Sequence, residues 1–229
     1  MGSAAGHQLR VVVLGDSVGT GAGCGCAPFG PRLARLLAGP LAQPVRVATL
    51  AQDGLTTPAL VRQLSGDPNT IAQVRRADAV AIVIGANDFD ADAAGTACTG
   101  TGTACFDAAL AALPLYLNEA ITRVRGLANP QVRILVLGYW NVFLDGVVGA
   151  QQGATYQNTS DALTKRVDAE LAERASLAGA TYVDLYAAFH RDEALDDTAL
   201  LASDGDHPNA AGHQRIAEVL VPYLLAHAR

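Results

Sequence analysis

The sequence predicts an α/β protein in which a five-stranded parallel sheet forms the middle layer of a three-layer α/β/α sandwich. Five short apolar runs occupy 9–14, 45–50, 79–84, 132–137 and 181–184. The runs are largely apolar rather than alternating, as expected of strands that are covered on both faces. Longer segments with helical spacing separate the runs, and this order of elements is typical of a parallel sheet between two helical layers.

The predicted helices follow from apolar residues that recur at intervals of three to four. They are expected over 31–38, 57–64, 70–75, about 159–178 and about 209–226. A further helix face consists of Leu110, Leu113, Leu117, Ile121 and Val124. Pro114 lies within that segment and is expected to break or kink the helix, because proline lacks the backbone N–H.

The segments 85–105 and 138–153 are expected to be long loops, which in compact proteins are often functional. Shorter Gly-rich or polar segments at 15–23, 51–56, 85–90 and 203–209 adjoin the ends of predicted strands or helices. Parallel sheets bind ligands at the carboxyl ends of their strands. These segments are therefore where we expect the chemistry.

The chain has 229 residues, half of them hydrophobic and 17% charged, with a net charge of −6. The charge argues against a nucleic-acid partner. No apolar run reaches the roughly 18 residues that a transmembrane helix needs. Residues 1–8 are interpreted as a cloning-derived tail without signal-peptide features, and 9–229 as a single domain.

Four cysteines, Cys24, Cys26, Cys98 and Cys105, allow three pairings. A local bridge between Cys98 and Cys105 is favoured and would stabilise the fold by roughly 2–2.5 kcal/mol. The pairing of Cys24 and Cys26 stays open, and free thiols in a cytosolic protein are the alternative. A metal site is disfavoured, because the sequence has no Cys-x-x-Cys and no histidine close to the cysteines. Oxidised cysteines would suit an exported protein.

Ser17 is the candidate nucleophile. It follows the first strand by three residues and precedes the small residues Gly19 and Gly21. Backbone N–H groups at such a turn can point toward developing negative charge. A serine is a poor nucleophile by itself and needs a partner base.

His207 is the candidate base, because Asp204 precedes it by three residues at the entry to the last helix. A carboxylate at that spacing can bond Nδ1 and leave Nε2 free to accept the serine proton. Asp204 could instead be only a turn residue. His190 stands in a His-Arg-Asp run like that of kinases, but the other kinase motifs are missing.

Asn87 and Gly54 are candidate oxyanion donors. Asn87 follows the third strand, and its amide can donate a hydrogen bond; Gly54 follows the second and can offer an unobstructed backbone N–H. Either residue alone is equally consistent with an ordinary turn. The argument is joint, since four strand-end segments each supply one part of a single acyl-transfer site.

Two other motifs at Ser17 are rejected. Residues 15–19 match the Gly-x-Ser-x-Gly elbow of α/β-hydrolases, but that elbow needs several strands before it, whereas Ser17 follows the first strand. The glycines from 15 to 25 suggest a phosphate loop, but no Gly-Lys-Ser/Thr is present and the Rossmann spacing fails.

Taken together, these segments resemble the four sequence blocks of the SGNH, or GDSL-type, hydrolase family, in the family's order and spacing. GDSV at 15–18, DGLT at 53–56, GANDF at 85–89 and DGDHPN at 204–209 carry the resemblance. It implies a flavodoxin-like fold, a Ser17–His207–Asp204 triad, and an oxyanion hole made by Ser17, Gly54 and Asn87. The cysteines are similar to those of exported actinobacterial members, which implies a disulfide between Cys98 and Cys105.

The expected function is hydrolysis of carboxylic esters of small molecules, lipids or glycans through a covalent acyl-enzyme, with no metal and no cofactor. Acyl transfer and carbohydrate O-deacetylation would use the same site, and a non-enzymatic binding module is the alternative from another class. Leu55, Phe89, Trp140 and Phe143 are expected either to line an acyl pocket or to pack in the core. We expect a monomer that is secreted or at the cell surface, with a cytoplasmic location left open.

Overall fold

The computed structural model describes residues 8–89, 102–143, 145–190 and 197–226. Its centre is a parallel sheet of five strands in the order β2-β1-β3-β4-β5. The strands are β1 (Arg10–Gly15), β2 (Arg46–Thr49), β3 (Ala79–Val83), β4 (Arg133–Leu137) and β5 (Thr181–Val183). The predicted five-stranded parallel sheet is confirmed, and the strand order is the flavodoxin-like one.

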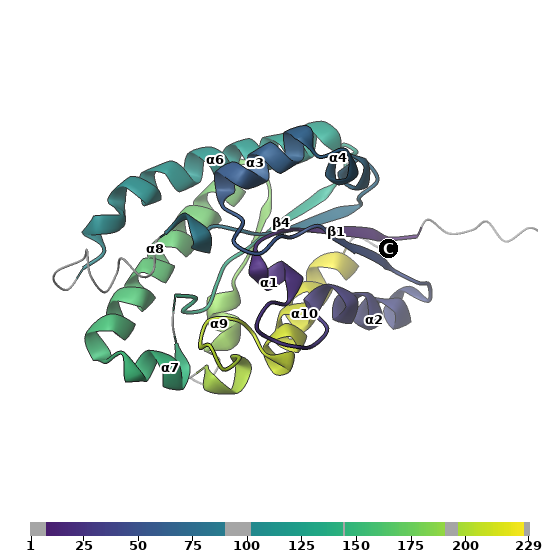
Figure 1. Cartoon of the computed structure of the whole chain (residues 1–229). Coiled ribbons are helices and arrows are strands. Elements are labelled where there is room, and N and C mark those ends of the chain that lie inside the picture. The colour runs from purple at the N-terminus through teal and green to yellow at the C-terminus, as the bar shows by residue number, and fades with distance from the viewer. Residues whose placement is uncertain (1–7, 90–101, 144, 191–196, 227–229) are drawn as a thin grey trace, which may run out of the picture.

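Helices cover both faces of this sheet (Figure 1). On one face α2 (Phe29–Leu41) packs against α10 (Ala210–Leu225); on the other, α6 (Asp107–Leu127) packs between α3 (Thr57–Gly66) and α8 (Ala154–Leu177). The remaining helical elements are α1 (Ser17–Thr20), α4 (Pro68–Val74), α7 (Gly146–Gln151), α9 (Leu185–Phe189), η1 (Ala86–Asp88), η2 (Ala104–Phe106) and η3 (Thr198–Leu200). The three predicted layers are therefore present.

The central strands explain why the apolar runs are continuous. β3 pairs with β1 on one side and β4 on the other, with Ile82 opposite Leu14 and Val83 opposite Leu137. All five residues of β3 are buried. Both faces of this strand contact helices, so neither face needs polar side chains.

The break expected at Pro114 is wrong, because α6 runs through it without interruption. Leu110, Leu113 and Leu117 are buried along one side of this helix. Packing of that face offsets the hydrogen bond that proline cannot donate. By length and composition alone, 104–127 would be the one helix in the described ranges able to cross a membrane, although here its apolar side packs against α3 and α8.

The expectation of a continuous loop over 138–153 is also wrong, since α7 lies within it. Asp145 caps this short helix by accepting a hydrogen bond from the N–H of Gly146 at 2.7 Å. Thr198, far away in the sequence, accepts another from the N–H of Val147 at 3.0 Å. α8 begins at Ala154, five residues earlier than predicted, because its first turns are polar and carry no apolar periodicity.

The sulfur atoms of Cys24 and Cys26 lie close together, with the Cα atoms 5.0 Å apart. Cys98 lies outside the described residues, so its pairing with Cys105 stays a prediction. Residues 1–7 of the expected N-terminal tail lie outside them as well.

Candidate active site

Ser17 lies at the carboxyl edge of the sheet, where the chain turns sharply out of β1. Gly15 has a φ of 126°, and a Cβ there would lie 1.7 Å from the carbonyl oxygen of Val83. Only glycine fits this crossing. The N–H of Asp16 donates to the Val83 carbonyl at 3.0 Å, and Asp16 then caps α1 by accepting from the N–H of Val18. Ser17 is consequently the first residue of α1, next to the middle strand.

His207 approaches Ser17 from the loop before α10. Its Nε2 lies 2.9 Å from Ser17 Oγ, and its Nδ1 lies 3.0 Å from Asp204 Oδ2. Ser17 and His207 are 190 positions apart in the sequence, and this hydrogen bond joins them. The three side chains predicted to act together form one continuous chain of hydrogen bonds.

The loop that carries His207 is held in place by hydrogen bonds from its own backbone to the Asp204 side chain. Asp204 Oδ1 accepts from the N–H groups of Asp206 and His207 at 3.1 and 3.0 Å. Burial alone would raise the pKa of Asp204, but these backbone N–H groups and the His207 side chain outweigh it and leave the pKa below 3.8. Asp204 is therefore ionised when it faces the imidazole.

Gly23 belongs to the glycine-rich segment that the sequence interpretation left without a role. A Cβ at Gly23 would lie 2.6 Å from Asp204 Oδ2 and 3.0 Å from the Cβ of His207. Its φ of 72° also favours glycine. This glycine lets the loop after α1 pass directly over the aspartate and the histidine.

Asn87 is positioned by contacts with the segment after β2. Its Nδ2 donates to the carbonyl of Leu55 at 3.2 Å, and the neighbouring Asp88 accepts from the N–H and hydroxyl of Thr57 at 3.0 and 2.8 Å. These bonds bring Asn87 beside the turn that contains Gly54, which has a φ of 70° and is exposed. The two predicted oxyanion donors are therefore brought to one region.

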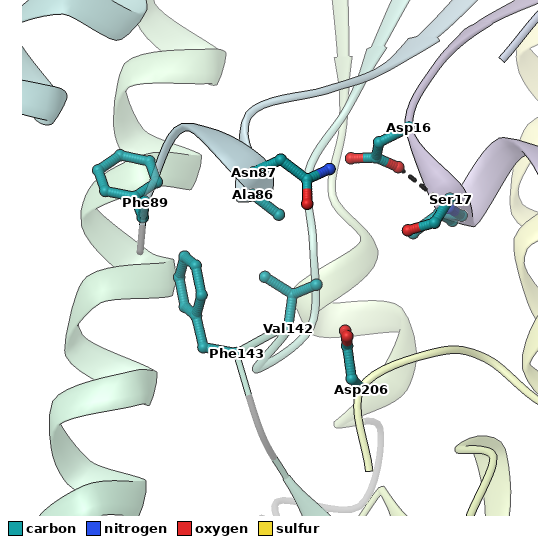
Figure 2. A pocket seen from close by; sticks show the side chains of 9 residues that line it. Asp16, Ser17, Ala86, Asn87, Phe89, Val142, Phe143 and Asp206 are labelled. Atoms are coloured by element: carbon teal, nitrogen blue, oxygen red, sulfur yellow. Dashed lines mark hydrogen bonds between the residues drawn. The ribbon is translucent and has the colours of Figure 1, made fainter. Parts of the chain in front are cut away.

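A cavity of about 100 Å³ opens beside Ser17 (Figure 2). Asp16, Ser17 and Asn87 lie on one side of it, and Phe89, Val142 and Phe143 form an apolar wall. The rings of Phe89 and Phe143 meet edge to face at 5.9 Å. Phe89 and Phe143, two of the four residues predicted for an acyl pocket, therefore line the cavity.

Leu55 and Trp140, the other two residues predicted for an acyl pocket, do not line this cavity. Trp140 is fully buried and stacks on Phe189 with ring centroids 4.5 Å apart. Its indole N–H donates to the carbonyl of Asp206 at 3.1 Å. Trp140 is therefore a core residue that bonds the loop carrying His207, as the core-packing alternative predicted for it.

Asp16 is an acid of the site that the sequence interpretation missed. It is buried against Tyr139, whose hydroxyl donates to Asp16 Oδ2. Burial raises the pKa of Asp16 to about 7, although the bonds from Tyr139 and Val18 oppose the rise. The sequence signal that could have identified Asp16 is its position directly before Ser17.

Asp206 is the second missed acid, and it lines the cavity below Ser17 in the view of Figure 2. Its Oδ2 lies 3.6 Å from His207 Nδ1. Partial burial and the nearby Asp204 raise its pKa to about 6, and His207 opposes them. A carboxyl group that ionises near neutral pH therefore lies on the wall of the cavity.

Two groups of described side chains are close enough to share a metal ion, and neither contains Ser17 or His207. The chemistry that the site offers is a serine hydroxyl bonded to an imidazole, with amide and backbone N–H donors beside it. Such an arrangement is suited to acyl transfer.

A model of the GDSL-like lipase/acylhydrolase family matches residues 13–215. The chain belongs to this family. No curated protein matches the chain significantly. The resemblance to the SGNH, or GDSL-type, hydrolases is thereby confirmed, and the protein falls in a family of ester hydrolases.

Solved structures of a lipase, a phospholipase and an acetylxylan esterase share the fold over nearly the whole chain. The lipase Lip_vut3 from a goat rumen metagenome has a TM-score of 0.74 at 19% identity, covering 97% of this chain and all of that one. Phospholipase A1 from Streptomyces albidoflavus NA297 has a TM-score of 0.70 at 25% identity, covering 96% of this chain and 99% of that one. The acetylxylan esterase Axe2 from Geobacillus stearothermophilus has a TM-score of 0.68 at 20% identity, covering 96% of this chain and 95% of that one.

Proposed function

We propose that this GDSL-type protein hydrolyses carboxylic esters with Ser17 as nucleophile, His207 as general base and Asp204 as the group that orients the histidine. The observation that carries the proposal is the unbroken chain Ser17 Oγ–His207 Nε2 (2.9 Å) and His207 Nδ1–Asp204 Oδ2 (3.0 Å). The Nδ1 proton is held by the carboxylate, so Nε2 presents its lone pair to the serine.

The reaction proceeds in two halves. Ser17 Oγ attacks the ester carbonyl while His207 Nε2 takes the hydroxyl proton, and Asp204 stabilises the imidazolium that forms. Collapse of the tetrahedral intermediate breaks the bond to the alcohol, which leaves with the proton from His207. Water then attacks the acyl-enzyme with the same proton transfers, releasing the carboxylic acid and free Ser17.

The oxyanion is stabilised by the N–H groups of Ser17 and Gly54 and by the amide of Asn87. Within the described residues, the N–H groups of Ser17 and Gly54 donate to no backbone carbonyl. One N–H of the Asn87 amide is bonded to Leu55 O, and its second N–H is left for the substrate. Donors held in place before the reaction need no reorganisation when charge develops.

The cavity favours short acyl groups. Its volume is about 100 Å³, which leaves little room for a long acyl chain. Phe89, Val142 and Phe143 give the acyl group an apolar wall, whereas ionised Asp206 disfavours a carboxylate at the mouth. The substrate class is therefore a small, uncharged acyl ester.

A second candidate is de-O-acetylation of a carbohydrate, because a small acyl cavity beside a hydrogen-bond-accepting carboxylate suits an acetyl group on a hydroxylated alcohol. Acyl transfer to an alcohol would use the same acyl-enzyme. Competing alcohols in the assay separate the two reactions, since transfer gives a new ester and hydrolysis gives only the acid.

We extend the proposal to the protein's setting. Disulfides Cys24–Cys26 and Cys98–Cys105 would fit an exported, monomeric enzyme, and the close approach of the first pair supports this. Counting free thiols with and without reductant tests the pairing: four free thiols before reduction would contradict it.

The test of function combines covalent labelling with an ester series. A fluorophosphonate should label wild type at Ser17, shown by peptide mass spectrometry, and should label Ser17→Ala at no residue. p-Nitrophenyl esters from acetate to decanoate should show the highest kcat/KM at two to four carbons. Labelling at another residue would overturn the nucleophile, and a maximum at long chains would overturn the short-acyl assignment.

A further inference from the structure

A second histidine with two aspartates lies away from the cavity, in a part of the molecule to which the reaction assigns no role. His190 ends α9, Asp145 caps the start of α7, and Asp197 precedes η3. One ligand atom from each residue lies within 4.8 Å of the other two. Three segments separated in the sequence therefore bring metal-binding side-chain types to a single point.

The cluster is almost completely closed to solvent. The side chains of His190, Asp145 and Asp197 are 6%, 3% and 0% exposed. His190 Nε2 lies 3.3 Å from Asp197 Oδ2 and 3.8 Å from Asp145 Oδ2. The cluster therefore offers one imidazole and two carboxylates, all of them metal-ligand types, at one buried point.

The orientation of His190 allows it to act as a metal ligand through Nε2. His190 Nδ1 lies 2.9 Å from the carbonyl of Tyr186, which can only accept, so Nδ1 carries the proton. In the neutral ring Nε2 then presents a lone pair to the two carboxylates. Nε2 is buried and makes no hydrogen bond within the described part of the chain. Stacking on the Tyr186 ring, with centroids 4.1 Å apart, fixes the ring plane.

We propose that His190 Nε2, Asp145 Oδ2 and Asp197 Oδ2 bind a divalent transition-metal ion, with Zn²⁺ as the best fit. Zinc bonds of about 2.0–2.1 Å in tetrahedral geometry separate neighbouring ligand atoms by about 3.3 Å. The observed separations from Nε2 are 3.3 and 3.8 Å, so binding requires only small movements. The imidazole disfavours Ca²⁺ and Mg²⁺, which prefer sets made only of oxygen. The Nδ1 bond to a backbone carbonyl is the usual support of a metal-bound histidine.

The ion would stabilise the segment that carries the active-site histidine. The N–H of Asp145 donates to the carbonyl of Gly205 at 2.8 Å, and Gly205 lies between Asp204 and Asp206. A Cβ on Gly205 would lie 3.1 Å from the Asp145 carbonyl oxygen, so the two backbones are in close contact. The site is therefore structural, linking α7, α9 and η3 beneath residues 204–207.

One other cluster could compete for zinc. Cys24, Cys26 and His213 also lie within metal-binding distance of one another. That site requires the two sulfur atoms as thiolates, whereas they lie in close contact. The experiment must therefore be run without reductant, and it must distinguish oxygen ligands from sulfur ligands.

The test starts from full-length protein dialysed against a chelator and then against metal-free buffer without reductant. Equilibrium dialysis with ZnCl₂ should give one zinc per chain. At free zinc about 100 times the dissociation constant, Tm should rise by about 5–10 °C. X-ray absorption of the zinc-bound wild type should show nitrogen and oxygen ligands without sulfur. No binding, or sulfur in the first coordination shell, overturns the proposal.

Variants assign the binding to these residues. His190→Gln and Asp197→Asn should each weaken zinc affinity about 100-fold or more, while His207→Ala and Cys24→Ser/Cys26→Ser should bind zinc as wild type does. Near-UV circular dichroism checks that each variant is folded. Zinc binding that survives in folded His190→Gln, or that is lost in His207→Ala, overturns the site. If neither ligand variant folds, the wild-type stoichiometry and ligand spectrum still decide.

Discussion

Two histidines in this protein each face two aspartates, yet their rings are turned in opposite ways. At His207 the carboxylate of Asp204 lies on Nδ1, and Nε2 points to Ser17. At His190 a backbone carbonyl lies on Nδ1, and Nε2 points to the carboxylates. The first ring therefore presents Nε2 to a hydroxyl, whereas the second presents Nε2 to two buried carboxylates.

Exposure separates the two clusters further. Asp204 keeps 41% of its side-chain exposure and accepts two backbone N–H bonds, so its charge is already solvated. Asp197 has no exposed side-chain surface. Similar residue types are therefore suited to different chemistry, depending on which nitrogen faces the acid and how much water reaches the carboxylate.

The largest expected effect tests whether His207 and Ser17 act as one unit. Ser17→Ala and His207→Ala should each lower kcat by about 10⁴-fold or more, and the double variant should lose little more, because members of one triad are not additive. Each Tm should stay within a few degrees of wild type, since neither side chain is in the core. Steady-state kinetics with p-nitrophenyl acetate and thermal unfolding measure both quantities.

The comparison would break if His207→Ala kept more than about one tenth of the wild-type kcat while folded. In that case the ring orientation at His207 would carry no catalytic meaning. Additive losses in the double variant would contradict the single unit.

Much of the active site could be predicted because its parts are adjacent in sequence to strand ends. Ser17 and Asn87 follow buried apolar runs, and Asp204 and His207 are three residues apart. The His190 cluster had no such local signal: Asp145 lies 45 residues before His190, and Asp197 reaches the cluster from the segment whose Thr198 accepts from the N–H of Val147 on α7. Sequence reasoning therefore considered His190 only as part of a kinase-like motif.

The same distinction holds for the fold. The five strands were predictable from continuous apolar runs, because burial on both faces leaves that pattern in the sequence. α7 and α9 were missed because they are six and five residues long, too short to show a helical period. Trp140 appeared to be a pocket residue until its stacking on Phe189 placed it in the core.

The next effect sharpens the comparison by testing the proposed oxyanion donors beside Ser17 and His207. Asn87→Ala should lower kcat by about 10²–10³-fold with a small change in KM, as for loss of one such donor. Asn118→Ala, an exposed change on α6, is the matched control and should leave kcat unchanged. A loss confined to KM would instead assign Asn87 to ground-state binding.

A third prediction concerns Asp16, a buried carboxyl group whose side-chain hydrogen bond comes from a tyrosine rather than from a histidine. Burial raises the pKa of Asp16 to about 7, so the folded protein holds this proton more tightly than the unfolded chain does. Its contribution to stability is therefore present below about pH 4 and is lost as the pH rises through 7. The loss should amount to roughly 3–5 kcal/mol.

Asp16→Asn should remove that part of the pH dependence, because the amide oxygen can still accept from the N–H of Val18 and carries no charge. Urea unfolding of wild type and Asp16→Asn at pH 4 to 8 measures the difference. The exposed Asp107→Asn, whose side chain is 62% exposed in the wild type, controls for loss of one carboxyl. A wild-type-minus-variant stability that is flat over this pH range would contradict the prediction.

The smallest expected effect concerns the apolar wall of the cavity beside Ser17. Phe143→Ala should enlarge the cavity where Phe143 meets Phe89 and should admit longer acyl chains. The ratio of kcat/KM for p-nitrophenyl hexanoate to that for acetate should rise about tenfold or more, within the range expected for a few methylenes in an apolar pocket. Leu115→Ala removes a side chain that is 70% exposed on α6 and should leave the ratio unchanged. An unchanged ratio in folded Phe143→Ala would mean that the acyl group lies elsewhere, with the cavity beside Ser17 holding the alcohol.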